Sequence, residues 1–89
     1  MKPVTPEQVK KNFVLPDHAI SVLNNIITKH FTGTESIFNK SELEEALWNQ
    51  GFSKNTIDSI IERIPKLYTQ YGWGIQVTKN GFIFQELLN

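Results

Sequence analysis

The chain has 89 residues, enough for one domain with a modest hydrophobic core but too few for a deep catalytic cleft. It contains no cysteine, which excludes disulfides, thiol chemistry and thiolate zinc sites, and it has no apolar run of membrane-spanning length. Lys plus Arg and Asp plus Glu number nine each, so the net charge of zero gives no general attraction toward nucleic acid.

The first predicted element is a short helix over residues 5–13. Thr5 suits the N-cap, Pro6 the first helical position, and Gln8 the reciprocal position of a capping box. Val9 and Phe13 lie four residues apart on one face of this helix. Because so short a helix is marginal alone, we expect it to dock through these two side chains.

A second helix is predicted after the restart at Pro16, ending at Gly33 as its C-terminal cap residue. Its apolar positions follow the helical period: Ile20, Leu23, Ile26, Ile27 and Phe31. Ile37 and Phe38 then predict a very short extended segment before the next helix begins.

The third helix is predicted to begin with a capping box, with Asn39 as the cap and Glu42 as its partner, and to end at Gly51. Its inner face is expected to comprise Leu43, Ala46 and Leu47. Trp48 falls just outside this face, and core edge and partner anchor remain equally open for it.

Ser53 is the predicted N-cap of the last helix, with Phe52 and Ile57 at the spacing of a hydrophobic staple. Pro65 interrupts the pattern, so the helix either stops at Ile64 or kinks and continues to Gly72. The periodicity favours continuation, because one apolar stripe passes through the proline: Ile57, Ile60, Ile61, Ile64, Leu67, Tyr68 and Tyr71.

The last element is a β-hairpin with Asn80 and Gly81 as a two-residue turn, in which both residues take positive φ. This turn predicts that Lys79 pairs with Phe82, Thr78 with Ile83, Val77 with Phe84, and Gln76 with Gln85. One face of the hairpin should then cover the helices with Trp73, Ile75, Val77, Phe82 and Phe84, and the other should expose Gln76, Thr78, Ile83 and Gln85.

This order of elements resembles the winged helix-turn-helix superfamily. Three segments carry the resemblance: residues 38–43 at the start of the third helix, residues 51–57 at the turn into the last helix, and Lys79-Asn80-Gly81 as the wing tip. The resemblance is one of pattern and covers residues 16–87. It implies an α+β fold with a three-helix core and a C-terminal hairpin wing, to which the short N-terminal helix is added. The length predicts one domain over residues 1–89, and residues 1–4 are expected to be flexible.

In that superfamily the last helix enters the DNA major groove and the wing contacts the backbone or the minor groove. Asp58 and Glu62 share the exposed helix face and would be repelled by phosphate. Carried over to this sequence, the resemblance makes these residues face double-stranded DNA: Lys54, Asn55, Ser59, Arg63, Lys79 and Asn80.

Each of these groups also has a plain structural interpretation. The charged residues of the last helix form a solvated face with spaced ion pairs. His18 and His30 lie too far apart on one helix to share a metal. The aromatic set is expected to build the core, with a stacking platform for single strands as the alternative: Tyr68, Tyr71, Trp73, Phe82 and Phe84.

We expect a non-enzymatic cytoplasmic protein without metal or cofactor, which binds DNA and regulates transcription. The alternative is a protein-interaction module that docks through Trp48, Glu44 and Glu45, and a homodimer using an exposed Ile83 also stays open. The surface charge discriminates between the two functions. A continuous basic stripe favours DNA, and a mixed surface favours the protein partner; the stripe would comprise Lys54, Arg63, Lys66 and Lys79.

Overall fold

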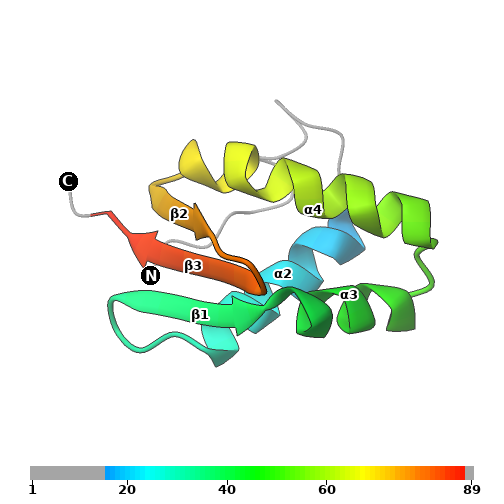
Figure 1. Cartoon of the computed structure of the whole chain (residues 1–89), viewed down its shortest axis with the longest axis horizontal. Helices are drawn as coiled ribbons and strands as arrows, with labels where there is room; N and C mark the ends of the chain where they lie inside the picture. Colours follow the sequence, from blue (N-terminus) through cyan, green and yellow to red (C-terminus); the bar gives the residue numbers. More distant parts are fainter. Residues whose placement is uncertain (1–15, 88–89) are drawn as a thin grey trace.

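The structure, a computed structural model, describes residues 16–87, so the predicted helix at 5–13 and the flexible residues 1–4 lie outside it. Within this range the fold is α+β, with three helices and one three-stranded antiparallel sheet (Figure 1). The elements are, in chain order, α2 (Asp17–Lys29), β1 (Glu35–Asn39), α3 (Lys40–Asn49), α4 (Lys54–Thr69), β2 (Trp73–Val77) and β3 (Gly81–Glu86).

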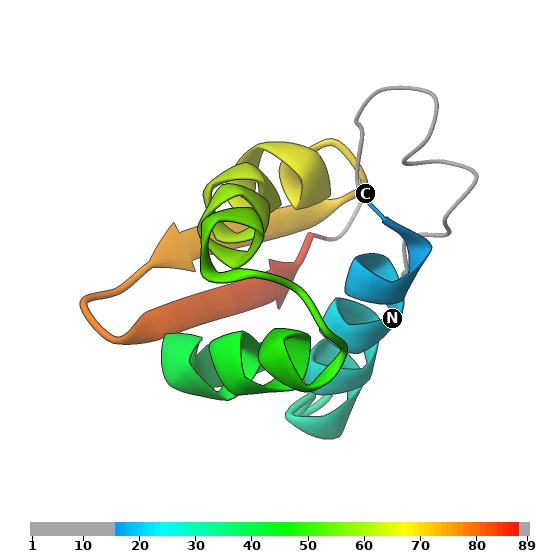
Figure 2. The ribbon, with the colours of Figure 1, turned by 90° about the vertical axis from the view of Figure 1, so that its right-hand side faces the viewer.

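The strand β3 is central in the sheet, which has the order β1-β3-β2. The pair Ile37↔Ile83 joins β1 to β3, and the pair Ile75↔Phe84 joins β2 to β3. The expected extended segment at residues 37–38 is therefore a full sheet strand. Figure 2 shows the β2–β3 hairpin projecting from the helices on the side away from α2.

The core lies between the helices and one face of the sheet, and aromatic rings fill its centre. The ring of Phe84 lies 5.4 Å from Phe38, 5.5 Å from Tyr68 and 5.9 Å from Trp73, measured between centroids. The Tyr68 hydroxyl donates to Asn24 Oδ1 at 2.7 Å, and burial raises the pKa of Tyr68. The aromatic set is thus core, with Tyr71 half-buried at its edge.

The prediction that Gly33 caps α2 is wrong. The helix ends at Lys29 with His30 as its C-cap, and Gly33 comes three residues later with φ of +110°. Phe31 bridges to Ser36 across this turn, so the chain reverses direction between them. The positive φ of Gly33 therefore belongs to the short turn that connects α2 to β1.

The predicted capping box of α3 is also wrong. Asn39 is the N-cap residue, but its side chain makes no capping hydrogen bond to the described part of the chain. The Glu42 carboxylate instead binds Lys29 and His30 on α2. The backbone N–H of Lys40 donates to the Asn80 carbonyl at 2.8 Å, so the hairpin tip satisfies a donor at this helix start.

The predicted turn between α3 and α4 is confirmed. Gly51 has φ of +93° and donates to the Trp48 carbonyl, while Phe52 donates to the Leu47 carbonyl, which is the Schellman pattern. Ser53 is the N-cap of α4, and its hydroxyl accepts from the Thr56 N–H. Both helix ends are therefore fixed by their own local hydrogen bonds.

The continuation of the last helix through Pro65 is confirmed as well. The helix α4 is continuous from Lys54 to Thr69, and the Thr69 hydroxyl donates to the Pro65 carbonyl. The predicted stripe is buried along its length, from Ile57 to Tyr68. The helix ends before Gly72, whose φ of +92° belongs to the turn into β2.

The predicted register of the hairpin is wrong by two residues, since Val77 pairs with Phe82 instead of Phe84. Residues 78–80 join β2 to β3; Thr78 N–H donates to the Gly81 carbonyl, and Gly81 N–H donates to Thr78 Oγ1. Neither Asn80 nor Gly81 has positive φ. A Cβ on Gly81 would lie 2.1 Å from the Phe38 carbonyl oxygen, so this glycine allows β1 to approach.

The shift of two residues preserves the two faces of the hairpin, because side chains alternate with a period of two. Val77 nevertheless is 62% exposed, because it ends β2 next to the loop, beyond the covered part of the sheet. Ile83, expected to be exposed, is half-buried beside Ile37 of β1. These are the two corrections to the predicted faces.

Candidate functional site

The most unusual surface residue of the described chain is Trp48, near the end of α3. Its side chain is 63% exposed, whereas the other tryptophan, Trp73, is 1% exposed in the core. Leu47, its neighbour in sequence, is fully buried. The structure therefore places Trp48 largely outside the core, in the solvent-exposed position that a partner anchor needs.

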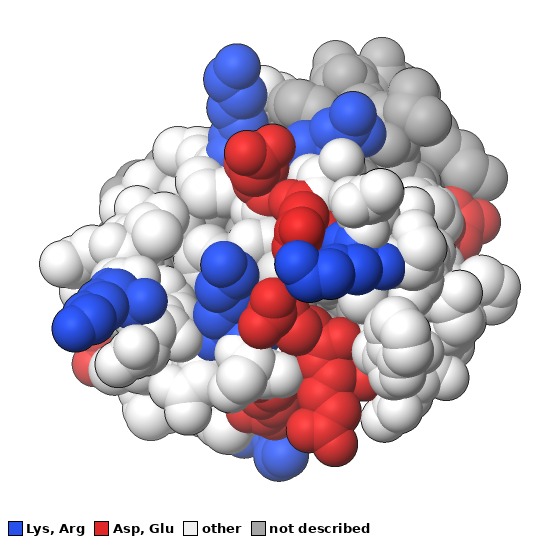
Figure 3. Space-filling view, turned by 45° about the vertical axis from the view of Figure 1, so that its right-hand side comes forward, with Lys and Arg blue, Asp and Glu red and all other residues white. Residues whose placement is uncertain are grey.

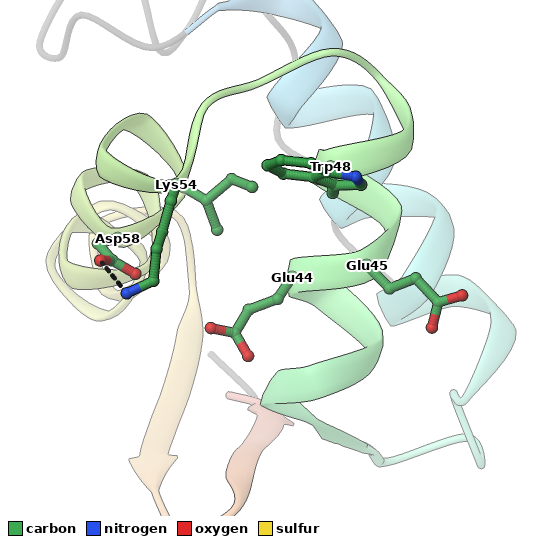
Figure 4. A pocket seen from close by; sticks show the side chains of 6 residues that line it. Glu44, Glu45, Trp48, Lys54 and Asp58 are labelled. Carbon is green, nitrogen blue, oxygen red and sulfur yellow. Dashed lines mark ion pairs between the residues drawn. The ribbon is translucent and has the colours of Figure 1, made fainter.

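A hollow lies beside Trp48, between the end of α3 and the start of α4. It has a volume of about 280 Å³, and Trp48 and Ile57 supply its apolar wall. Figure 4 shows the Trp48 ring extending from α3 toward α4. We call it the Trp48 hollow; its lining comprises Glu44, Glu45, Trp48, Lys54, Ile57 and Asp58.

Charged groups surround this apolar wall. Lys54 Nζ lies 3.9 Å from Asp58 Oδ2, an exposed i,i+4 pair that contributes little to stability. Within residues 16–87, neither Glu44 nor Glu45 forms an ion pair. Glu44 extends toward α4 and Glu45 toward the opposite side of α3 (Figure 4). The rim thus carries one cation and three anions, an acidic excess.

A second hollow, of about 450 Å³, continues along the gap between the two helices and shares Glu44, Lys54 and Asp58 with the first. Lys40 and Glu62 line its far end. The surface between α3 and α4 therefore changes from apolar near Trp48 to mixed charge farther along.

The residues expected to read DNA are all exposed, which the proposed contacts require. Asn55, Ser59 and Arg63 lie on the solvent side of α4. Figure 3 shows that basic and acidic groups alternate on this face, without a continuous basic stripe among the described residues. The charge pattern is therefore mixed. Lys54 belongs both to the residues expected to face DNA and to the lining of the Trp48 hollow.

The hairpin tip lies against the start of α3. Lys79 and Asn80 line a hollow with Asn39, Lys40 and Glu44, and the Asn80 carbonyl accepts the Lys40 N–H. Val77 lines a further hollow together with Pro65. Lys79 and Asn80, the two residues expected to contact DNA from the wing, thus lie next to the start of α3.

A polar cluster joins the end of α2 to the start of α3. Glu42 Oε1 lies 2.8 Å from His30 Nε2, and Lys29 Nζ donates to Glu42 Oε2 at 3.2 Å. Partial burial raises the pKa of Glu42, but the hydrogen bonds from Lys29 and His30 and their charges outweigh it, so this pKa lies below its ordinary value. Residues 16–87 contain no group of three or more side chains suited to hold a metal.

The sequence does not predict that Ile57 and Asp58 take part in the hollow. Its periodicity predicts Ile57 as a core residue, and in the structure Ile57 is buried and also forms part of the apolar wall. The signal was present in the short turn of residues 50–53, which places the first turn of α4 beside the last turn of α3. Asp58 follows from its i,i+4 spacing to Lys54.

Comparison with protein-family models, curated proteins and solved structures finds no match for this chain. Across residues 16–87, no helix combines the length and the hydropathy that crossing a bilayer demands.

Proposed function

We propose that this chain is a non-enzymatic winged-helix module of the cytoplasm that docks on another protein through the Trp48 hollow. The order of helix, strand, two helices and hairpin supports the winged-helix assignment. One observation carries the docking function: a largely exposed tryptophan beside an apolar hollow, whereas the other large aromatic side chains within residues 16–87 are buried or half-buried. Tryptophan is enriched among the residues that dominate protein interfaces.

The charge of the surface supports the same choice. Asp58 and Glu62 interrupt the basic residues of α4, and Lys54 is already paired with Asp58. Carboxylates within a DNA-facing surface oppose phosphate binding. Protein interfaces instead combine an apolar centre with a rim of both charge signs.

The test begins with capture of the partner by the full chain and its identification, followed by binding measurements with the two purified proteins. We expect Trp48→Ala to weaken binding by at least about tenfold, because truncating a central tryptophan removes an anchor. Asn49→Ala, a change at the exposed neighbour on α3, is the matched control and should bind as wild type does. Circular dichroism checks that both variants fold.

A partner that binds both Trp48→Ala and Lys54→Glu as tightly as wild type would contradict docking at this surface. Lys54 lines the hollow, so Lys54→Glu reverses a charge at the rim of the same site. The pair of variants therefore tests the apolar wall and the rim separately.

DNA binding with transcription regulation is the second candidate, and the Ser53-capped start of α4 favours it. This end of α4 presents Lys54 and Asn55 where winged-helix proteins read bases, and Lys79 lies at the hairpin tip. Binding of a duplex should then fall steeply with salt, with a logarithmic slope of about −3 if three cations each neutralise a phosphate. Lys79→Glu should weaken DNA binding and leave docking at the Trp48 hollow unchanged.

A further inference from the structure

Local hydrogen bonds hold the backbone on both sides of the Trp48 hollow. The Gly51 N–H binds the Trp48 carbonyl at 2.9 Å, which fixes the end of α3. The Ser53 side chain fixes the first turn of α4, and Ile57 is anchored in the core. These contacts define the backbone around the hollow without a partner, which limits the backbone conformational entropy lost on binding.

The size of the hollow selects the kind of occupant. Its volume of about 280 Å³ lies at or below the low end for small-molecule pockets. Its wall of Trp48 and Ile57 offers contact to a bulky apolar group, and its charged side chains lie at the rim. An apolar side chain that projects from a polypeptide fits this shape, because its own backbone supplies the orientation.

The rim selects the charge of the residues next to that side chain. Lys54 is offset by Asp58, which leaves the charges of Glu44 and Glu45 on the two flanks of α3. Both carboxylates fall within the range over which charges act at physiological salt if a partner chain crosses Trp48. A neighbouring Lys or Arg would therefore be attracted, and an Asp or Glu repelled.

The same charges disfavour two other occupants. Phosphates of a nucleic acid would meet the carboxylates of Glu44, Glu45 and Asp58. A second copy of this chain joined by a two-fold axis at Trp48 would place one acidic rim against the other.

We propose that the Trp48 hollow binds a polypeptide segment in which a bulky apolar residue lies next to Lys or Arg. The apolar side chain packs against Trp48 and Ile57, and the basic side chain pairs with Glu44 or Glu45. This inference rests on the proposed docking function and adds the chemistry of the partner to it.

The probe is a library of short random peptides displayed on phage and selected on the full chain, with the selected peptides then synthesised for binding measurements. The expected peptides share a bulky apolar residue close to a Lys or Arg. Trp48→Ala should weaken their binding by at least about tenfold. The double variant Glu44→Gln/Glu45→Gln should weaken it by about threefold or more and reduce its salt dependence.

Asn49→Ala is the control with unchanged binding. Selected peptides that lack basic residues, or that bind the double glutamine variant as wild type, overturn the proposed chemistry while docking at Trp48 stands. Peptides insensitive to Trp48→Ala, or no enriched peptide, overturn the hollow as a site for a linear segment. The docking function itself is judged separately, by the purified protein partner.

Discussion

Gly81 shows how a single residue serves a contact far away in the sequence. A Cβ at this position would lie 2.1 Å from the Phe38 carbonyl oxygen and 2.9 Å from the Asn39 Cα. Both atoms belong to the backbone of β1, which cannot move away without breaking the β1–β3 pairing. The glycine is therefore required by the sheet and not by the turn.

We expect Gly81→Ala to lower the free energy of unfolding by about 2–3 kcal/mol, because the methyl group forces the two strands apart. Urea denaturation measures the change. Gly74→Ala is the matched control, since its Cβ would first meet the end of the Leu87 side chain, and it should change stability by less than about 1 kcal/mol. Equal effects of the two variants would contradict this account.

Glu42 makes stability depend on pH. Despite partial burial, hydrogen bonds from Lys29 and His30 hold the pKa of Glu42 in the folded protein below its ordinary value, so folding favours the ionised carboxylate. Its contribution is present above the unfolded pKa and is lost as the pH falls through the folded pKa. We expect the stability difference between wild type and Glu42→Gln to be fully present at neutral pH and to shrink as the pH falls below the ordinary glutamate pKa of about 4.3.

Denaturation at a series of pH values tests this expectation. Glu45→Gln is the control, because Glu45 is exposed on the same helix and has no ion pair within the described part of the chain. A Glu42→Gln difference that stays constant from neutral to acid pH would rule out the ion cluster as its source.

At the scale of the element, α4 carries a built-in weakness. Pro65 has no N–H for the Ile61 carbonyl, and its ring crowds the preceding turn, yet the helix runs on to Thr69. The buried stripe from Ile57 to Tyr68 compensates, because ending the helix at Pro65 would withdraw Leu67 and Tyr68 from the core.

We expect Pro65→Ala to raise the free energy of unfolding by about 1–2 kcal/mol, after allowing for the larger conformational entropy of the unfolded variant. Lys66→Ala, at the exposed neighbouring position, should change stability by less than about 0.5 kcal/mol. Thermal and urea unfolding measure both variants. A less stable Pro65→Ala would show that the packing of the ring outweighs the missing hydrogen bond.

The elements that the sequence predicted well are those decided by their immediate neighbours. The turn from α3 to α4 was predictable because Gly51 and Ser53 each act on residues a few positions away. The hairpin register was not predictable, because Gly81 is required by its close contact with the backbone of Phe38, more than forty residues earlier. The capping box failed for the same reason, since Lys29 and His30 compete for Glu42.

For the molecule as a whole, composition predicted the balance of charge but not its arrangement. The nine positive and nine negative side chains are consistent with many surfaces. Folding alternates the two signs on the face of α3 and α4 and leaves an acidic excess around Trp48. The exposure of Trp48 itself was undecidable from periodicity, because its position borders the buried face of α3.

The hydrogen bond from Lys40 N–H to the Asn80 carbonyl, together with the pairing of Asn39 with Gly81, ties the hairpin tip to the start of α3. The tip cannot swing as a free arm, because such a movement would break both links. The position of the hairpin tip is therefore fixed relative to the start of α3, the helix that carries Trp48 near its other end.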